Sequence, residues 1–476
     1  MAEATYDVAI IGSGPAGYTS AIRAGQWGLK TCLIEKDNKL GGTCLHVGCI
    51  PTKALLFNAE IWDYVKSAKD FGIEGVNTPK LNWAAIQQRK SKIVQKHAKG
   101  LEFLMRKNKV DTVEGYGRLA GAAKDGILSV EVSTEGGVAG GKTKLIRAKN
   151  VLLATGSEAK MLPGLEPDSQ VLTNIEILSL QAVPKSMVIV GAGAVGVEFA
   201  SIYRSFGTEV TILEALARVV PVEDEEISKE LLRAFKKRGI NCFTGALVKK
   251  VDKMKTGISV AFAVEGKEQS IEAEKILIAV GRAPRTDTLG LEKTKIKPER
   301  GFIKTNEWMQ TDEPGVYAIG DIVAGMPQLA HAGSMQGLVA VAKIAGKPAR
   351  PVSRNRIPSC TYCEPQIGSV GLTEAAAKER GGEIKVGKFP FSANSKASIL
   401  GAHEGFIKVV SDARYGEILG VHIIGPSATE LIAEAVTAME LEATADDLMF
   451  TIHAHPTLSE AMLDATNSVY GLAINV

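Results

Sequence analysis

The chain has 476 residues, which is too long for one ordinary hydrophobic core and predicts several domains. Hydrophobic residues make up 45% of the chain and charged residues 23%, as is usual for a globular protein. The formal net charge of +3 is close to neutral and implies no nucleic-acid partner, and no apolar run approaches the about 20 residues that span a bilayer.

The N-terminus and the cysteine content bear on the compartment. The first residues, MAEATYDVAIIG, contain acids where a secretory signal has a basic region, so no such signal is expected. Six cysteines in a chain of this length do not form the dense disulfide framework of small secreted proteins. We expect a cytoplasmic protein; a mature form in the mitochondrial matrix, without its transit peptide, stays open.

A strand, a glycine loop, a helix and a second strand open the chain. The strand YDVAII leads into a loop with Gly12, Gly14 and Gly17, and the second strand ends at Glu35. In such a loop the glycines allow a tight turn, close approach of the backbone to a pyrophosphate, and close packing of helix on strand. The pattern predicts a dinucleotide site, with Glu35 placed to accept a hydrogen bond from a ribose hydroxyl.

The next segment contains two cysteines near a predicted helix start. Cys44 and Cys49 are separated by four residues, and Pro51 and an apolar run follow. Proline is tolerated in the first turn of a helix, so we expect Cys49 at or just before a helix N-terminus, where the dipole lowers a thiol pKa. A thiolate beside a second thiol can perform disulfide exchange. Two buried structural cysteines are the alternative, which the flanking glycines, Lys53 and the glycine loops disfavour.

The strand–loop–helix–strand–acid unit occurs a second time. Gly191, Gly193 and Gly196 follow the strand MVIV, and Glu214 ends the next strand at the same spacing as in the first copy. A decayed copy kept only for packing is disfavoured, because all three glycines and the acid are present. We therefore predict two dinucleotides. Glu214 would accept from a ribose 2′-hydroxyl and repel a 2′-phosphate, so we predict NAD at the second site although Arg218 is nearby.

The pattern changes near Arg350. Alternating apolar residues in GFIKVVSD and EILGVHIIG favour an antiparallel sheet, and helices are predicted at residues 428–440 and 460–468. Cys360 and Cys363 form a CxxC motif in this part of the chain. We interpret both as structural, because the motif lacks the βαβ setting of a thioredoxin-like site.

The segment GGTCLHVGCIPTKALL resembles the redox-active segment of the flavoprotein disulfide reductases, most closely the dihydrolipoamide dehydrogenases. The resemblance extends from about Tyr6 to about Leu472. One residue departs from the family pattern within this segment, since the family usually has Asn where this chain has His46. We expect this position to tune local hydrogen bonding.

The resemblance implies FAD at the first loop and NAD at the second. It places Thr155 and Gly156, in VLLATGS, next to the FAD, and it identifies TDEPGVYAIGD as a second flavin motif. In that motif Gly320 and Asp321 reach the cofactor, and Asp321 would bind the ribitol chain. Gly281, after a buried strand, is carried over as a cofactor-binding residue.

The resemblance also implies the catalytic residues. Cys44 is carried over as the outer, interchange thiol and Cys49 as the thiol that meets the flavin. In TIHAHPTLSE the family pattern selects His455 as the base, supplied by the other subunit, with Glu460 orienting its imidazole. His453 is interpreted as a packing residue.

A buried ion pair near the flavin is implied as well. The family has a lysine and a glutamate at the positions of Lys53 and Glu198. The pair would place positive charge where negative charge develops on the cofactor. No metal site is predicted.

The predicted fold is α/β, with two Rossmann-like dinucleotide-binding domains, a central segment and a C-terminal α+β dimerisation domain. The predicted boundaries are residues 1–149 for the FAD domain, 150–282 for the NAD domain, 283–349 for the central domain and 350–476 for the interface domain. The implied activity is oxidation of protein-bound dihydrolipoamide through a Cys44–Cys49 disulfide and FAD, with NAD⁺ as acceptor. The implied partners are a second copy of the chain and a lipoyl-bearing carrier or acyltransferase; no nucleic acid or membrane is expected.

Two other functions stay open. A different disulfide reductase, such as glutathione or mercuric reductase, is disfavoured by Glu214 and by a C-terminus, GLAINV, without a cysteine pair. A catalytically silent flavin-binding scaffold is disfavoured by the presence of both cysteines with His455 and Glu460. The sequence does not identify the lipoyl protein that would be the natural partner.

Overall fold

The computed structural model describes residues 5–122, 125–134 and 143–475. The chain forms two compact units, each built from three segments. The first unit contains Met1–Ala54, Gln87–Lys160 and Arg282–Arg354, and the second contains Leu55–Ile86, Met161–Gly281 and Asn355–Val476. Within the described ranges, no helix has both the length and the apolar character that crossing a membrane requires.

A mostly parallel sheet forms the centre of the first unit. Its strands pair in the order β3-β2-β1-β6-β5-β4, and β17 also pairs with β6. The strands are β1 (Tyr6–Ile11), β2 (Thr31–Glu35), β3 (Asp111–Glu114), β4 (Tyr116–Ala122), β5 (Leu128–Ser133), β6 (Thr143–Leu153) and β17 (Val316–Ala318). The parallel pairing of β17 with β6 brings the second flavin-like motif to the first sheet.

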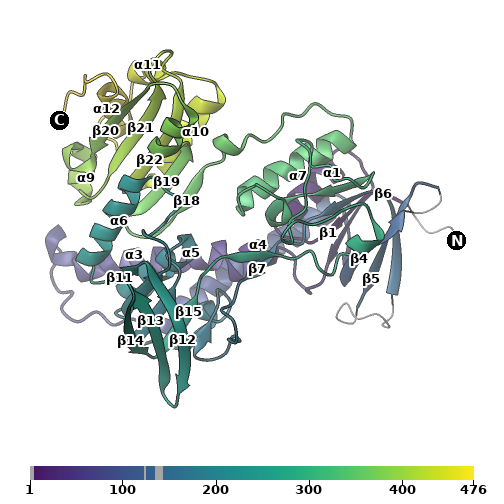
Figure 1. Cartoon of the computed structure of the whole chain (residues 1–476), viewed down its shortest axis with the longest axis horizontal. Coiled ribbons are helices and arrows are strands. Elements are labelled where there is room, and N and C mark those ends of the chain that lie inside the picture. The colour runs from purple at the N-terminus through teal and green to yellow at the C-terminus, as the bar shows by residue number, and fades with distance from the viewer. Residues whose placement is uncertain (1–4, 123–124, 135–142, 476) are drawn as a thin grey trace. The chain divides into compact units, whose positions relative to one another are not determined.

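Both faces of this sheet are buried, as a parallel sheet requires. In β1, Val8 and Ile10 face a core shared with α1 (Pro15–Gln26) and α7 (Ala330–Ile344), whereas Ala9 and Ile11 face a second core. Helices α1 and α7 are far apart in the sequence but lie side by side (Figure 1). The alternation of side chains along β1 therefore supplies both cores.

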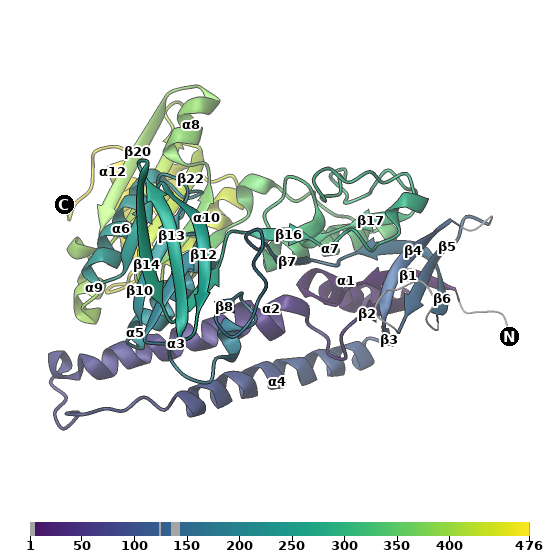
Figure 2. The ribbon, with the colours of Figure 1, turned by 60° about the horizontal axis from the view of Figure 1, so that its bottom comes forward.

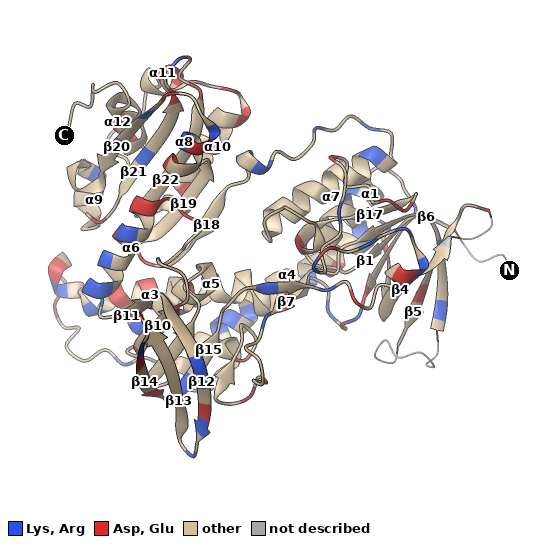
Figure 3. Ribbon diagram, viewed as in Figure 1, with Lys and Arg blue, Asp and Glu red and all other residues tan. Residues whose placement is uncertain are grey.

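Three helices carry or flank the cysteine segment. They are α2 (Gly42–Val47), α3 (Cys49–Lys66) and α4 (Trp83–Lys107). Lysines and arginines recur along α4 (Figure 3), and Lys92, Lys96 and Lys99 are exposed. The basic residues of α4 therefore mainly form a solvated helix face.

A second, fully parallel sheet lies in the second unit, in the order β11-β10-β9-β15-β8. Its strands are β8 (Val171–Leu172), β9 (Ser186–Val190), β10 (Glu209–Glu214), β11 (Asn241–Thr244) and β15 (Lys275–Ile278). The connecting helices are α5 (Ala194–Ser205) and α6 (Glu225–Lys237). Strands β12 (Ala246–Met254), β13 (Gly257–Val264) and β14 (Lys267–Ala273) form a separate antiparallel sheet (Figure 2).

The C-terminal part of the second unit is an antiparallel sheet in the order β18-β19-β22-β21-β20. The strands are β18 (Ser359–Thr361), β19 (Gln366–Gly371), β20 (Ile384–Pro390), β21 (Phe406–Asp412) and β22 (Ile418–Gly425). The helices are α8 (Glu374–Arg380), α9 (Ser395–Leu400), α10 (Ala428–Glu440), α11 (Ala445–Met449) and α12 (Glu460–Ser468). The predicted antiparallel sheet and both predicted helices are confirmed.

The remaining elements are short. Strands β7 (Ser157–Ala159) and β16 (Arg282–Pro284) pair with each other in the first unit. The 3₁₀ helices are Ala68–Phe71, Ile177–Ser179, Leu291–Lys293, Gly320–Ile322, Arg354–Arg356 and Phe391–Ala393.

A buried lysine joins three carboxylates inside the second unit. The side chain of Lys408, in β21, is only 2% exposed. Its Nζ lies 2.9 Å from Asp224, 2.8 Å from Glu226 and 2.7 Å from Glu374. Asp224 is the N-cap of α6, and Lys408 lies in β21. The cluster therefore connects α6 to the C-terminal antiparallel sheet.

Candidate functional site

The first glycine loop has the geometry that a bound pyrophosphate needs. Gly12 has φ +103°, and a Cβ there would lie 2.3 Å from the carbonyl oxygen of Ala154. A Cβ on Gly17 would lie 1.8 Å from the carbonyl oxygen of Gly12, so α1 can pack this closely only with glycine. A Cβ on Gly14 would meet nothing within 4 Å, which leaves open space beside the N-terminus of α1. The loop therefore fits the phosphates of a dinucleotide.

The second loop repeats this geometry residue by residue. Gly191 has φ +104° and would place a Cβ 2.4 Å from the carbonyl oxygen of Ala279. A Cβ on Gly196 would lie 2.0 Å from the oxygen of Gly191, and one on Gly193 would again meet nothing within 4 Å. The recurrence of the same three constraints supports a second dinucleotide at the start of α5.

The two strand-end acids also hold the loops. Glu35 accepts hydrogen bonds from the backbone N–H and the hydroxyl of Ser13, at 2.9 and 2.6 Å. Glu214 accepts from the N–H of Ala192 at 2.6 Å and from that of Leu216 at 2.8 Å. A carboxylate has about four acceptor sites, so each acid can hold its loop and still accept from a ribose hydroxyl.

The other predicted flavin residues are linked by hydrogen bonds within the first unit. The hydroxyl of Thr155 donates to the carbonyl of Arg285 at 2.6 Å, and Gly156 has φ +69°. The hydroxyl of Ser157 donates to Asp321 at 2.5 Å, while Arg282 donates to the Ser157 hydroxyl at 2.7 Å.

Two of the predicted cofactor glycines have backbones that favour glycine. Gly320 has φ +75°, and a Cβ there would lie 3.3 Å from Ala16 at the start of α1. Gly281 has φ +115°, and it belongs to the second unit. The segment before Asp321 thus approaches the helix that follows the first glycine loop.

The two cysteines of the redox-like segment lie on consecutive helices. Cys44 is within α2 and Cys49 is the first residue of α3, as predicted from Pro51. The pKa of the Cys44 thiol is raised, first by a hydrogen bond to Cys49 and then by burial, while the charge of Lys53 acts in the opposite direction. The raised pKa means that Cys44 holds its proton more strongly than an ordinary thiol.

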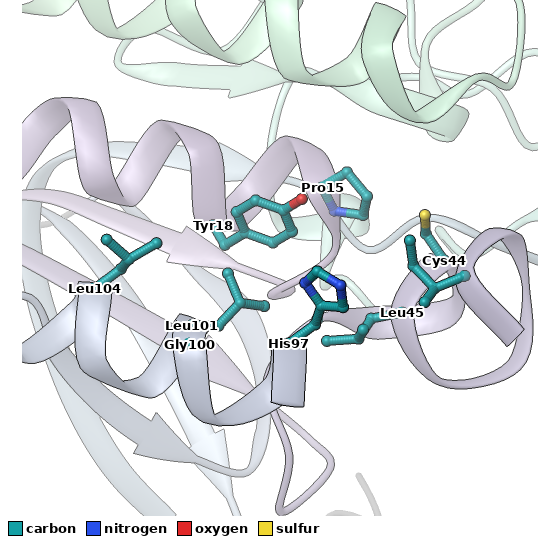
Figure 4. Close-up of a pocket in the computed structure, with 10 residues that line it drawn as sticks. Pro15, Tyr18, Cys44, Leu45, His97, Gly100, Leu101 and Leu104 are labelled. Carbon is teal, nitrogen blue, oxygen red and sulfur yellow. The ribbon is translucent and has the colours of Figure 1, made fainter. Parts of the chain in front are cut away.

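A mainly apolar pocket of about 200 Å³ adjoins Cys44. Figure 4 shows Cys44 at one end of this pocket and Leu104 at the other, with Tyr18 and His97 between them. Burial raises the pKa of the Tyr18 hydroxyl, and the charges of Cys44 and Cys49 raise it further. The pocket can hold a small apolar group with its reactive end at Cys44.

The predicted base and its orienting acid form a hydrogen-bonded pair in the second unit. Nδ1 of His455 lies 2.9 Å from Oε1 of Glu460, and the N–H of Thr457 donates to Oε2 at 2.8 Å. Partial burial would raise the pKa of Glu460, but the hydrogen bonds from Thr457 and His455 outweigh it and lower the pKa. His453 instead has both ring nitrogens engaged, by Glu434 at 2.7 Å and by the carbonyl of Thr451 at 3.0 Å.

The predicted ion pair stays a prediction. Lys53 is half-buried in the first unit, and Glu198 is 4% exposed on α5 in the second. Oε1 of Glu198 accepts from the N–H of Tyr362 at 3.0 Å.

The CxxC motif has separate partners for its two thiols. The sulfur of Cys360 is 3.8 Å from the carbonyl of Thr429, and that of Cys363 is 3.2 Å from the carbonyl of Pro365. Burial raises the pKa of Cys363. These contacts agree with a structural interpretation.

Sequence reasoning missed several residues of the site. Ser13, Ser157 and Arg282 directly follow residues that the motifs identified, and their polar side chains in otherwise small, apolar stretches were an available signal. Tyr18 and His97 line the pocket from separate helices, and no local pattern indicated them.

Comparison with known proteins matches these features to one family. Residues 6–337 match the family model of the pyridine nucleotide-disulphide oxidoreductases, and residues 357–466 match the dimerisation domain of the same family. A dihydrolipoyl dehydrogenase from Bacillus subtilis is 46% identical over 99% of both chains. One from Rhizobium etli is 44% identical over the full length of both.

Solved structures agree with this assignment. LpdA from Mycobacterium tuberculosis superposes with a TM-score of 0.88 at 25% identity, covering 97% of this chain and 98% of its own. The HOCl-induced flavoprotein disulfide reductase RclA from Escherichia coli gives a TM-score of 0.84 at 26% identity, covering 97% and 99%. The chain belongs to the pyridine nucleotide-disulphide oxidoreductases and, within them, to the dihydrolipoyl dehydrogenases.

Proposed function

We propose that this protein oxidises the dithiol of a dihydrolipoyl group through a Cys44–Cys49 disulfide and passes the electrons to NAD⁺. The cofactors of its family are FAD and NAD, and both glycine loops have the space and exposed helix starts that these dinucleotides need. The observation that supports the proposal most strongly is the hydrogen-bonded thiol pair of Cys44, in α2, and Cys49, at the start of α3, next to an apolar pocket.

Thiol–disulfide exchange would start at Cys44, which lines the pocket. One substrate thiolate attacks the Cys44 sulfur, breaks the Cys44–Cys49 bond and forms a mixed disulfide, with Cys49 leaving as thiolate. The second substrate thiol then attacks the substrate sulfur of this mixed disulfide. The attack closes the lipoyl disulfide and releases Cys44. The substrate loses two electrons and two protons, and the protein disulfide becomes a dithiol.

His455 would accept the proton of the second substrate thiol. Its Nδ1–H, donated to Glu460, leaves Nε2 as the basic nitrogen, and the side chain is 70% exposed and so accessible to a substrate. We propose that this base serves the cysteines of a second copy of the chain. The match to the family's dimerisation domain, which contains His455, supports a homodimer.

The remaining residues would hold the cofactors. When bound, FAD supplies a two-electron acceptor between the dithiol and NAD⁺. Lys53, paired with Glu198, would keep positive charge near the flavin. The proposed FAD ligands are Gly12, Gly14, Gly17, Glu35, Thr155, Gly156, Gly320 and Asp321, and the proposed NAD ligands are Gly191, Gly193, Gly196, Glu214 and Gly281.

The natural electron donor would be a dihydrolipoyl group on a separate carrier or acyltransferase protein. An arm of this kind suits the pocket beside Cys44, because its dithiol end is small and mainly apolar. We propose a cytoplasmic location, on the support of bacterial relatives such as that of Bacillus subtilis.

A direct assay tests the proposal. The purified protein should reduce NAD⁺ with free dihydrolipoamide. NADP⁺ should be a poor replacement for NAD⁺ as acceptor, and glutathione a poor replacement for dihydrolipoamide as donor. Cys44→Ser should abolish the activity, whereas Cys242→Ser, at a half-buried cysteine in β11, should preserve it. Full activity of Cys44→Ser, or glutathione as the better donor, would overturn the proposal.

A further inference from the structure

His46 bonds a single peptide group in front of the helix that carries Cys44. Its Nε2 lies 2.8 Å from the carbonyl oxygen of Leu40. A carbonyl only accepts, so Nε2 carries the proton and donates it. His46 is near the end of α2, so this bond connects the last turn of the helix to Leu40, the residue before the Gly41–Gly42 pair where the helix begins.

The other end of the same peptide group is also bound. The N–H of Gly41 donates to the hydroxyl and the carbonyl of Ser13, both at 3.1 Å. Ser13 is fully buried, and its own N–H and hydroxyl donate to Glu35. One peptide thus links the first glycine loop to the side chain between the two redox cysteines.

The residues that follow Leu40 in this turn have little conformational preference of their own. Gly41 has φ +121° and Gly42 has φ +58°, so both adopt a left-handed region that glycine enters without cost and leaves as easily. The N-cap of α2 is Gly41, which has no side chain to cap the helix. Helix α2 has six residues and ends at Gly48, and a helix this short is not stable by itself.

We propose that His46 is a positioning residue of the redox pair. Through the Nε2 donor to Leu40 it holds α2, and with it Cys44, at the start of α3 where Cys49 lies. This inference rests on the proposed function, because it concerns the disulfide that the reaction uses. It also gives a role to the one position where this chain departs from the family pattern in this segment.

The predicted consequence is thermodynamic. A disulfide forms only when the two Cα atoms are about 4.4–6.8 Å apart, and holding α2 keeps the reduced thiols near that geometry. Without the hydrogen bond, α2 can move in the dithiol form but is still held by the covalent bond in the disulfide form. The disulfide therefore becomes less stable relative to the dithiol. The loss of one part-buried hydrogen bond corresponds to about a three- to tenfold fall in the equilibrium constant for disulfide formation.

The test measures that constant in the FAD-loaded protein. The protein is equilibrated without oxygen in mixtures of oxidised and reduced dithiothreitol, where each protein disulfide formed converts one oxidised dithiothreitol to its dithiol. After acid quenching, thiols are alkylated and the Cys44–Cys49 disulfide is quantified by mass spectrometry. His46→Leu removes the donor at similar size, and His46→Gln retains an amide donor of similar reach.

We expect His46→Leu to lower the constant about three- to tenfold, where tenfold corresponds to about 30 mV, and His46→Gln to stay within about twofold of the native value. His46→Asn introduces the residue that the family usually has here, whose donor is closer to the backbone, and it should also lower the constant. This variant replaces His46→Leu in the test if the Leu variant does not fold. Equal constants for all variants, or equal shifts for Leu and Gln, would overturn the role of His46. Absence of any Cys44–Cys49 disulfide in the native chain would instead overturn the proposed function.

Discussion

Nδ1 of His455 lies 2.9 Å from Oε1 of Glu460, five residues later in the chain and in the first turn of α12. The other carboxylate oxygen accepts the N–H of Thr457 at 2.8 Å, so the acid is fixed by the backbone as well as by the ring. Because a carboxylate that accepts from Nδ1–H leaves Nε2 as the acceptor nitrogen, this pair is suited to a proton-accepting role at Nε2.

Removal of the base should reduce turnover strongly. We expect His455→Gln to lower kcat about 10²–10⁴-fold, the usual contribution of a general acid–base group. Glu460→Gln should lower kcat about 10- to 100-fold, since a hydrogen bond to a charged group contributes ~1.5–3 kcal/mol. The measurement is steady-state oxidation of dihydrolipoamide with saturating NAD⁺.

A neighbouring pair provides the control for that experiment. His453 and Glu434 are 2.7 Å apart, but the His453 side chain is only 6% exposed and both of its ring nitrogens are engaged. A His453→Gln variant that folds should retain kcat within about threefold. A larger loss of kcat in His453→Gln than in His455→Gln would show that His455 is not the base.

Nucleotide preference should depend on Glu214. The native protein should prefer NAD over NADP by at least about tenfold, equal to ~1.4 kcal/mol. Glu214→Gln removes the charge that would repel a 2′-phosphate while it retains an oxygen that can accept from the loop, so the preference should narrow. Glu209→Gln, an exposed acid at the start of the same strand, should leave the preference unchanged. Equal rates of the native protein with NADH and NADPH would contradict NAD specificity.

The buried lysine should contribute to stability above acidic pH. Lys408→Met would leave Asp224, Glu226 and Glu374 without their shared cation, and we expect a loss of about 3–5 kcal/mol in the free energy of unfolding. Lys388→Met, at a lysine 43% exposed that also contacts Glu226, should cost less than about 1 kcal/mol. Denaturant titrations of the two variants give the comparison, and equal losses would contradict it.

The pH dependence of this cluster has a definite sign. Burial alone would raise the pKa of Asp224, but the hydrogen bonds from Lys408 and from the N–H of Glu374 outweigh it and lower the pKa. The stabilisation is therefore complete above the unfolded-state pKa of about 3.9 and is lost as the pH falls through the lower folded-state value. The stability difference between the native protein and Lys408→Met should shrink in that acidic range.

The effect of Cys49 on the Cys44 pKa is testable by alkylation. Cys49 raises the pKa of Cys44 chiefly through their hydrogen bond. In Cys49→Ala the Cys44 pKa should fall, so at a fixed pH near 7 Cys44 of the reduced protein should react with iodoacetamide at least about tenfold faster. Cys242→Ala should leave the Cys44 rate unchanged. A slower reaction in Cys49→Ala would contradict a Cys44 pKa raised by its hydrogen bond to Cys49.

Local patterns were sufficient for much of the fold. Both glycine loops, the helix start at Cys49 and the antiparallel strands near the C-terminus follow from spacing, proline and alternation within short stretches. Such features depend on neighbours in the sequence, so their physical causes are visible in it.

Features formed by remote segments were not predictable in this way. Lys408 lies in an alternating strand where a lysine suggests an exposed face, yet it is buried by acids about 30 to 180 residues away in the chain. Tyr18 and His97 line one pocket because the fold brings α1 and α4 together there. The position of His46 was noticed from the sequence, but its bond to Leu40 depends on a turn made by Gly41 and Gly42.

The most direct test of the proposed site is complementation between two inactive chains. Cys44→Ser and His455→Ala chains with different affinity tags are co-expressed, and the mixed dimers are isolated by purification on both tags in turn. If His455 serves the cysteines of the partner, each mixed dimer has one intact site and one with both defects, and it should show about half of native activity in dihydrolipoamide oxidation. Mixed dimers without activity would contradict a centre formed by Cys44 and Cys49 of one chain and His455 of the other.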